Sequence, residues 1–195
     1  MKHYYDRRAT EFDDWYLGTG LFADRERPEW GEDLRALKRT IAGLPPARTL
    51  DVACGKDFLT QHLGGAITGL DQSERMLEIA RGRISGGSLV RGDALALPFD
   101  EGTFGRVFTA HFYGHLHEKE RRAFLREVRR VAGELVVVDA ALRPDKEPEE
   151  LQERVLSDGS RHEIYKRYFD PAELAEELGG GHVLFSGAWF VVVGA

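Results

Sequence analysis

An apolar run that ends in an acidic residue and a small-residue turn, residues 49–57 (TLDVACGKD), constrains the fold of this chain more than any other feature. Residues 50–52 are expected to form a buried strand, and helical spacing begins at Phe58. The small residues Ala53 and Gly55 let a ligand approach the backbone, and a helix N-terminus offers unpaired N–H groups. The segment therefore predicts the strand–turn–helix corner at which α/β proteins bind nucleotides.

Strands and helices are expected to alternate from this point onward. Apolar runs predict strands at residues 50–52, 66–70, 88–90, 106–110 and 135–138, and helical spacing predicts helices at 58–63, 76–80, 124–131 and 172–178. Two closely spaced strands, 182–185 and 188–193, indicate a terminal antiparallel hairpin. Alternation of this kind requires right-handed crossovers, so the chain is predicted to be an α/β protein with a mainly parallel sheet covered on both faces.

The length of the chain, 195 residues, favours one domain with a sizeable core. Within residues 1–195, residues 1–45 are expected to form an N-terminal helical lid and cover, and residues 46–195 the core. One apolar helical stripe lies in the cover, formed by Leu34, Leu37, Ile41 and Leu44. Gly43 and the two prolines after it are expected to end that helix.

Charge and cysteine content limit the partners of the chain. A net charge of −6 argues against broad electrostatic attraction to nucleic acid or to an anionic membrane. The single cysteine, Cys54, excludes an intrachain disulfide framework and suits a reducing compartment. No stretch is apolar for long enough to cross a bilayer, and the N-terminus has no apolar signal core. We expect a cytoplasmic protein, monomer or homodimer, that binds neither nucleic acid nor membrane.

Acidic residues follow three of the expected strands. Asp71 lies 20 residues after Asp51 (71 − 51), and a carboxylate there can accept two hydrogen bonds from ribose hydroxyls. The alternative for Asp71 is a helix cap before Ser73, and Asp93 could cap a short helix as well. The ordered set of Asp51, Asp71 and Asp93 favours a nucleoside pocket. A nicotinamide site is disfavoured because the complete Gly-x-Gly-x-x-Gly fingerprint is absent.

From about residue 41 to the C-terminus, the chain resembles the class I S-adenosylmethionine-dependent methyltransferases that act on small molecules. Their first motif reads acidic-x-Gly/Ala-x-Gly-x-Gly, which Asp51, Ala53 and Gly55 match, and residues 92–99 (GDALALPF) resemble their third-strand motif. The resemblance implies a Rossmann-like, doubly wound, seven-stranded sheet, mainly parallel with a C-terminal antiparallel hairpin. It also implies methyl transfer from S-adenosylmethionine to an unidentified small-molecule acceptor, which leaves S-adenosyl-L-homocysteine.

The resemblance further implies which residues contact the cofactor. It places Asp71 at the ribose, Asp93 at the adenine amino group and the backbone N–H of Ala94 beside it. Gln72 or Met76 could flank the adenine. The full set of expected cofactor-binding residues is Asp51, Ala53, Gly55, Asp57, Asp71, Gln72, Met76, Asp93, Ala94 and His111.

Asp57 departs from the family pattern, which usually has glycine at this position. A carboxylate there could crowd the cofactor and repel its carboxylate, or it could pair with its ammonium group. The interpretation that we favour is that Asp57 caps the following helix, since Asp is a preferred N-cap residue. The departure leaves an alternative function open, an impaired or nonenzymatic protein that binds S-adenosylmethionine or S-adenosylhomocysteine on the same fold.

Catalytic candidates follow the fourth strand, at His111, Tyr113 and His115. In the family this strand end faces the transferable methyl group, so the resemblance implies that His111 and Tyr113 touch cofactor or acceptor. His115 could act as a general base. A metal site is not expected, because no carboxylate cluster with recognisable ligand spacing accompanies the histidines.

Aromatic residues from two distant segments are expected to close the site from above. Aromatic faces attract a sulfonium through cation–π interactions and exclude water. The candidates are Tyr4, Tyr5, Trp15, Tyr165 and Tyr168. The charged connection at residues 143–150 could form a flap.

Overall fold

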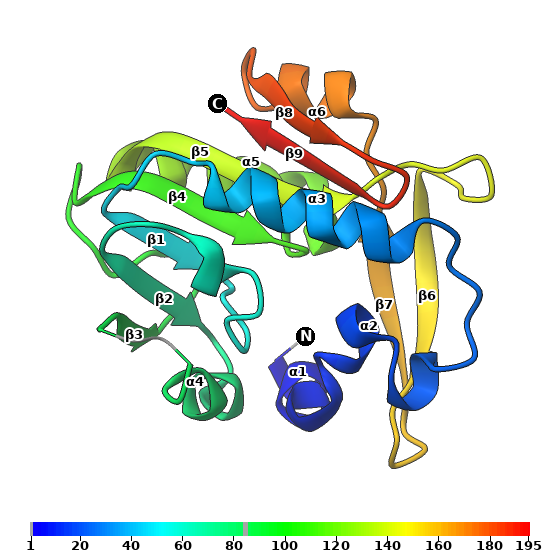
Figure 1. Ribbon diagram of the computed structural model, residues 1–195. Coiled ribbons are helices and arrows are strands. Elements are labelled where there is room, and N and C mark those ends of the chain that lie inside the picture. The colour runs from blue at the N-terminus through cyan, green and yellow to red at the C-terminus, as the bar shows by residue number, and fades with distance from the viewer. Residues whose placement is uncertain (1, 84–85) are drawn as a thin grey trace.

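A seven-stranded sheet forms the centre of the molecule (Figure 1). The computed structural model describes residues 2–83 and 86–195. The strand order is β3-β2-β1-β4-β5-β9-β8, with bounds β1 Thr49–Val52, β2 Ile67–Asp71, β3 Ser88–Arg91, β4 Phe104–Ala110, β5 Ala132–Ala140, β8 His182–Ser186 and β9 Phe190–Gly194. The first five strands run parallel, whereas β9 is antiparallel to both β5 and β8. The predicted sheet and its terminal hairpin are confirmed.

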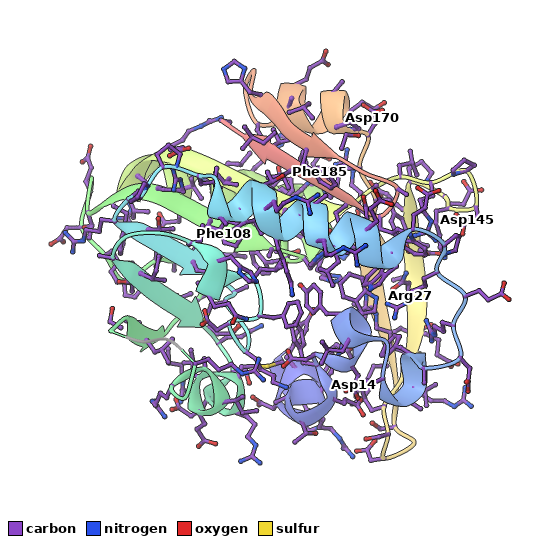
Figure 2. The ribbon with its side chains drawn as sticks, viewed as in Figure 1. Asp14, Arg27, Phe108, Asp145, Asp170 and Phe185 are labelled. Carbon is purple, nitrogen blue, oxygen red and sulfur yellow. The ribbon has the colours of Figure 1, made fainter. Side chains whose placement is uncertain are left out.

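Apolar side chains cover both faces of the central strands. In β5, Val137 points into one layer of the core and Val136 into the other, because successive side chains of a strand alternate between faces. The first layer includes Phe124 of α5 (Glu118–Val131), and the second includes Leu37 of α3 (Trp30–Ala42). Phe108 of β4 belongs to the second layer, beneath α3 (Figure 2). The continuous apolar run in β5 thus reflects burial on both faces.

Four of the predicted helices are present, α3, α4 (Glu74–Ala80), α5 and α6 (Pro171–Glu177), and one is not. The crossover helix α4 is capped by Ser73, whose Oγ accepts from the amide of Met76, and the terminal helix is α6. The helix expected at residues 58–63 is wrong, because only one 3₁₀ turn, η3 (Thr60–His62), forms there. The pair of glycines that follows, with Gly65 at φ +99°, interrupts the backbone before a second turn can form.

Short helices at the N-terminus cover the carboxyl ends of the strands. They are α1 (Lys2–Arg8), η1 (Ala9–Glu11), α2 (Asp14–Leu17) and η2 (Gly20–Phe22). Figure 1 shows α1 and α2 between α4 and a separate two-stranded hairpin. Within residues 2–83 and 86–195, no helix has the length and apolar character that a membrane span requires.

The separate hairpin consists of β6 (Glu149–Val155) and β7 (Arg161–Arg167), which pair antiparallel. Its strands were not predicted; residues 143–150 were expected to form a charged flap, and they instead lead into β6. Burial along β6 alternates between exposed and half-buried positions, so one face of the hairpin turns towards the protein. This face closes the space above the turn η4 (Tyr113–His115).

Candidate functional site

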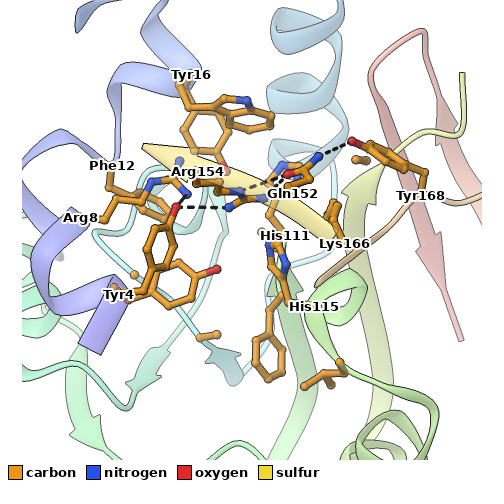
Figure 3. Close-up of a pocket in the computed structure, with 18 of the residues that line it drawn as sticks. Tyr4, Arg8, Phe12, Tyr16, His111, His115, Gln152, Arg154, Lys166 and Tyr168 are labelled. Carbon is orange, nitrogen blue, oxygen red and sulfur yellow. Dashed lines mark hydrogen bonds between the residues drawn. The ribbon is translucent and has the colours of Figure 1, made fainter. Parts of the chain in front are cut away.

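A cavity of about 1100 Å³ opens where the parallel strands end, beneath the N-terminal helices and the β6–β7 hairpin. Turns after β1, β2, β3 and β4 contribute to its walls, and so do α1, α2 and β6. This is the position at which open α/β sheets bind ligands, because the loops that leave the strands diverge there. Figure 3 shows residues that line it, among them Tyr4, His111 and Lys166.

The turn after β1 is joined to the end of β2 at the cavity wall. The backbone takes left-handed angles at Ala53 (φ +60°) and Gly55 (φ +56°), which brings the Gly55 amide 3.0 Å from Oδ2 of Asp71. The amide of Ser73 donates to Oδ1 of Asp71 across 2.8 Å. Burial raises the pKa of the Asp71 carboxyl, which is 8% exposed. Each of its oxygens keeps a lone pair for a ligand hydroxyl.

A second acid and an apolar wall lie beside Asp71. Asp93 lines the cavity, and its Oδ1 accepts a hydrogen bond from the amide of Leu95 across 2.9 Å. Further cavity residues are Leu70, Gln72, Met76, Ala94 and Leu95. Two acceptor carboxylates with an apolar surface between β2 and β3 are chemically matched to a nucleoside, whose ribose diol and exocyclic amine are donors. Asp71 does not cap α4, since Ser73 holds that position.

Two acids that were expected at the cofactor, Asp51 and Asp57, lie outside the cavity wall. Asp51 is 2% exposed and accepts a hydrogen bond from the hydroxyl of Thr60, while burial raises its pKa well above the ordinary value. Asp57 is fully buried at φ +72°, and neither of its carboxyl oxygens has a hydrogen-bond partner among the described residues. Its capping interpretation is wrong, because Leu59 occupies the N-cap position of η3.

His111 lies in an aromatic part of the cavity wall. Its ring contacts Trp15 at 4.9 Å and Phe190 at 5.6 Å between centroids, and its Nδ1 lies 3.9 Å from Oδ1 of Asp139. Burial lowers the pKa of His111 to about 3, although Asp139 opposes this shift. The ring is therefore neutral near pH 7. Its left-handed backbone (φ +53°) turns the chain out of β4.

His115 also lines the cavity, at 5% exposure. Its Nδ1 lies 2.7 Å from the carbonyl oxygen of Tyr165, so a neutral ring must carry its proton on Nδ1. Nε2 then keeps a free lone pair. Burial and the charges of Lys166 and Arg154 lower the pKa of His115 well below its ordinary value. This tautomer can accept a proton at Nε2, as a general base would.

The structure places Tyr113 outside the cavity, contrary to the expectation that it touches cofactor or acceptor. Its side chain is fully buried in the core, and its hydroxyl donates to Oε1 of Glu177 across 2.7 Å. The reason is local. An extended strand would turn residues 111, 113 and 115 to one face, but the 3₁₀ turn η4 rotates Tyr113 away from His115.

Asp139 and Lys166 form a buried ion pair at the cavity that was not predicted. Lys166 Nζ donates to Oδ1 of Asp139, and the amide of Gly114 donates to Oδ2 across 2.8 Å. Burial alone would raise the pKa of Asp139, but the charge of Lys166 outweighs it and lowers that pKa. Asp139 follows a buried apolar run in β5, the same signal that identified Asp71, so the sequence did contain a clue to it.

The aromatic lid forms from four of the five expected residues. Tyr4, Tyr5, Trp15 and Tyr168 line the cavity. Tyr165 lies outside it, with its ring 4.2 Å from that of His117. His117 itself is exposed at the start of α5. Across residues 2–83 and 86–195, no group of three or more histidine, cysteine, aspartate or glutamate side chains is arranged to hold a metal ion.

Two arginines of the cavity wall, Arg8 and Arg154, were also missed (Figure 3). Arg8 ends α1 and Arg154 lies in β6, so they approach each other only in the folded chain. Neither belongs to a local motif. No signal in the sequence could have paired them.

Comparisons with known proteins agree with this geometry. A family model described as a methyltransferase domain matches residues 50–134. A demethylmenaquinone methyltransferase of Thermotoga maritima is 36% identical over 121 residues, which is 56% of this chain and 52% of the relative. The solved structure of a DhpI–SAH complex has a TM-score of 0.76 at 27% identity and covers 98% of this chain and 92% of that chain. A DhpI–SAM–HEP complex has a TM-score of 0.74 at the same identity.

The similarity covers about half of the demethylmenaquinone methyltransferase but nearly all of DhpI. The chain spans about half the length of the demethylmenaquinone methyltransferase, and the family model matches only the part from β1 to the start of β5. The likeness to DhpI extends over nearly the whole of both chains. It therefore includes the N-terminal helices and the β6–β7 hairpin, which enclose the cavity.

Proposed function

We propose that this chain is a class I S-adenosylmethionine-dependent methyltransferase, which binds S-adenosylmethionine and transfers its methyl group to a small-molecule acceptor. The arrangement of Gly55 and Asp71 supports this proposal most directly. A carboxylate at the end of β2, held by the turn after β1, presents its remaining lone pairs to the cavity. A DhpI structure that matches nearly the whole chain was solved as an SAH complex.

Asp71 is assigned to the ribose hydroxyls and Asp93 to the adenine amino group. Leu70 and Met76 supply the apolar surface beside them, and Ala53 and Gly55 allow close approach of the turn to the remainder of the cofactor. The cavity of about 1100 Å³ extends beyond this part to His111, His115 and Lys166. That second part is where we place the acceptor.

When bound, S-adenosylmethionine supplies an activated methyl group: an acceptor lone pair forms the new bond to carbon, and the S–C bonding pair passes to sulfur, which becomes a neutral thioether. The protein must therefore hold donor and acceptor in line and exclude water. Trp15 and His111 form an aromatic wall for this purpose. Where the acceptor atom carries a proton, Nε2 of His115 is the group that can receive it.

Asp57 supports a second candidate, a protein that binds the cofactor without efficient turnover. A buried carboxylate that lies two residues after Gly55, with no hydrogen-bond partner in the described part of the chain, makes the cofactor turn suboptimal. Its side chain nevertheless lies outside the cavity wall, so it does not block the nucleoside part directly. Methyl transfer remains the better supported function.

Calorimetric titration separates these functions from each other and from a nicotinamide oxidoreductase. S-adenosylmethionine and S-adenosylhomocysteine should bind, whereas NAD should not. Asp93→Ala should weaken S-adenosylhomocysteine binding, while Asp100→Ala, an exposed acid outside the cavity, should not. Formation of S-adenosylhomocysteine with a panel of acceptors then distinguishes an enzyme from a binding protein. Binding of NAD alone would refute the proposal.

His115→Gln provides a second test once an acceptor is known. The substitution removes the titratable nitrogen and keeps a polar side chain of similar size. For an acceptor that must lose a proton, the turnover rate should fall by about 100-fold or more, with unchanged affinity for S-adenosylhomocysteine. An unchanged rate would assign the proton to another group.

A further inference from the structure

Arg8 and Arg154 reach the cavity from opposite sides and meet at one phenol oxygen (Figure 3). Nη1 of Arg8 donates to the hydroxyl oxygen of Tyr4 across 2.9 Å, and Nη1 of Arg154 lies 3.5 Å from the same oxygen. Arg8 is only 8% exposed, and Arg154 is partly buried. Two guanidinium charges thus share one neutral acceptor, and two like charges at such close range repel each other.

No carboxylate within residues 2–83 and 86–195 forms a salt bridge with either guanidinium. Nε and Nη2 of Arg154 donate to the neutral amide oxygen of Gln152, across 3.1 and 2.8 Å. Besides its hydrogen bond to Tyr4, Arg8 packs against the ring of Phe12 at 5.0 Å. Buried charges are normally paired, because an unpaired one loses its hydration without compensation.

Three other cations of the same cavity wall do have a carboxylate partner. Lys166 is paired with Asp139, Arg143 with Asp145 and Lys146 with Glu150. Asp145 and Glu150 of the cavity wall are thus already engaged by Arg143 and Lys146. Arg25 and Arg27 of this wall have no carboxylate partner among the described residues, but Arg25 is exposed to solvent and Arg27 donates to the carbonyl oxygen of Trp15. The guanidiniums of Arg8 and Arg154, which lie together and have no carboxylate partner among the described residues, therefore remain available to an anion that enters the cavity.

The position of Arg154 distinguishes an acceptor from the cofactor. Its charge contributes to lowering the pKa of both His111 and His115, at the end of β4. Gln152, to which it donates, is bonded in turn to the hydroxyl of Tyr168 across 2.6 Å. Arg154 is thus held by β6 over the part of the cavity where we place the acceptor.

We propose that the methyl acceptor is a small anion whose carboxylate or phosphoryl oxygens are bound by Arg154, with Arg8 as the second cation. The assignment rests on the proposed function, since it concerns the acceptor part of the same cavity. A guanidinium presents parallel N–H donors that match two oxygens of either group. An anion between Arg8 and Arg154 would also neutralise their mutual repulsion, which no described carboxylate does.

The test measures anion binding without catalysis. Inorganic phosphate and acetate are titrated separately into the protein by calorimetry at low chloride, with and without saturating S-adenosylhomocysteine. Phosphate represents a tetrahedral phosphoryl group, and acetate represents a planar carboxylate. The ion that binds with the higher affinity therefore indicates which of the two groups the acceptor carries. At least one should bind the wild-type protein, and Arg154→Gln should weaken that binding by about tenfold or more.

Matched controls come from neighbouring arginines. Arg161 lies on β7 of the same hairpin, is exposed and pairs with Glu153, so Arg161→Gln should bind the anion as the wild type does. Arg8→Gln should also weaken anion binding, whereas Arg7→Gln, which removes an exposed partner of Asp158, should not. This second pair keeps the test decisive if Arg154→Gln fails to fold.

The outcomes show whether Arg154 and Arg8 bind an anionic acceptor, the cofactor or neither. Failure of both anions to bind the wild type, or undiminished binding to folded Arg154→Gln and Arg8→Gln, would overturn the inference. A parallel loss of S-adenosylhomocysteine affinity in Arg154→Gln would assign this arginine to the cofactor's own carboxylate, which also overturns it. If S-adenosylhomocysteine does not bind the wild type at all, the proposed function fails, and the titrations without it still report on the anion site.

Discussion

The amide of Gly55 donates to Oδ2 of Asp71 across 3.0 Å, which ties the turn after β1 to the carboxyl end of β2. The same carboxylate accepts from the amide of Ser73, where α4 begins. One side chain thus orders the turn, the strand end and the helix start around the part of the cavity assigned to the nucleoside. Its replacement should affect ligand affinity more than the fold, because the three segments are also held by the sheet and the core.

Asp71→Ala should weaken S-adenosylhomocysteine binding by about 10- to 150-fold in a protein that remains folded. The range corresponds to about 1.5–3 kcal/mol for hydrogen bonds to a charged acceptor. Calorimetry measures the affinity, and circular dichroism checks the fold. Glu74→Ala, which replaces a partly exposed acid in the first turn of α4, is the matched control and should bind normally. Unchanged affinity in folded Asp71→Ala would remove Asp71 from the ribose site.

The strands at the centre of the sheet could be predicted from local sequence because burial on both faces leaves a continuous apolar run. Residues 135–138 are an example, and the acid that follows such a run reaches the ligand-binding edge by geometry alone. Asp71 and Asp93 were therefore found as cavity residues, and Asp139 could have been found in the same way.

Pairings made only by the folded chain could not be predicted. The β6–β7 hairpin is mostly polar and half exposed, so its strands have no apolar signal, yet it contributes Arg154 and Lys166. The prediction for Tyr113 failed because its sequence signal was present but misleading. Its spacing from His111 and His115 fits a strand, but the backbone leaves β4 at Ala110 and enters η4.

Asp57→Asn should remove a pH-dependent loss of stability. Burial raises the pKa of the Asp57 carboxyl to about 6, so between about pH 4 and pH 6 the folded state binds this proton more tightly than the unfolded state does. The wild type therefore loses stability as pH rises through this window, and the loss persists above it. Because asparagine cannot ionise, the variant should gain as much as about 3 kcal/mol above pH 6 and little below pH 4.

Urea unfolding of both proteins from pH 4 to pH 7 measures this difference, and other titrating groups cancel in the comparison. The side chains are nearly isosteric, and asparagine tolerates the left-handed backbone at this position. A stability difference that does not vary with pH would show that Asp57 ionises at an ordinary pKa in the folded protein.

Asp57→Gly should both stabilise the protein and tighten S-adenosylmethionine binding. Glycine restores the family pattern, relieves the left-handed backbone at φ +72° and removes a buried carboxylate that has no described hydrogen-bond partner. We expect a gain of about 1–3 kcal/mol at pH 7, because no helix cap is lost. Thermal unfolding and calorimetry measure the two effects. Weaker binding would instead make Asp57 a cofactor ligand, and its negative charge would match the ammonium group.

Gly114→Ala should separate the β7 strand from the turn that carries His115. A Cβ atom at Gly114 would lie 2.7 Å from the backbone oxygen of Arg167, 2.9 Å from Lys166 Nζ and 3.0 Å from Oδ1 of Asp139. The backbone oxygen cannot move without the strand, so we expect a loss of about 1–3 kcal/mol in urea unfolding. Gly133→Ala in β5 is the control, since its Cβ would meet nothing within 4 Å, and it should change stability by less than about 0.5 kcal/mol. Equal stability of the two variants would mean that β7 packs less tightly on the turn than these distances require. The ion pair between Asp139 and Lys166 would then tolerate a side chain at position 114.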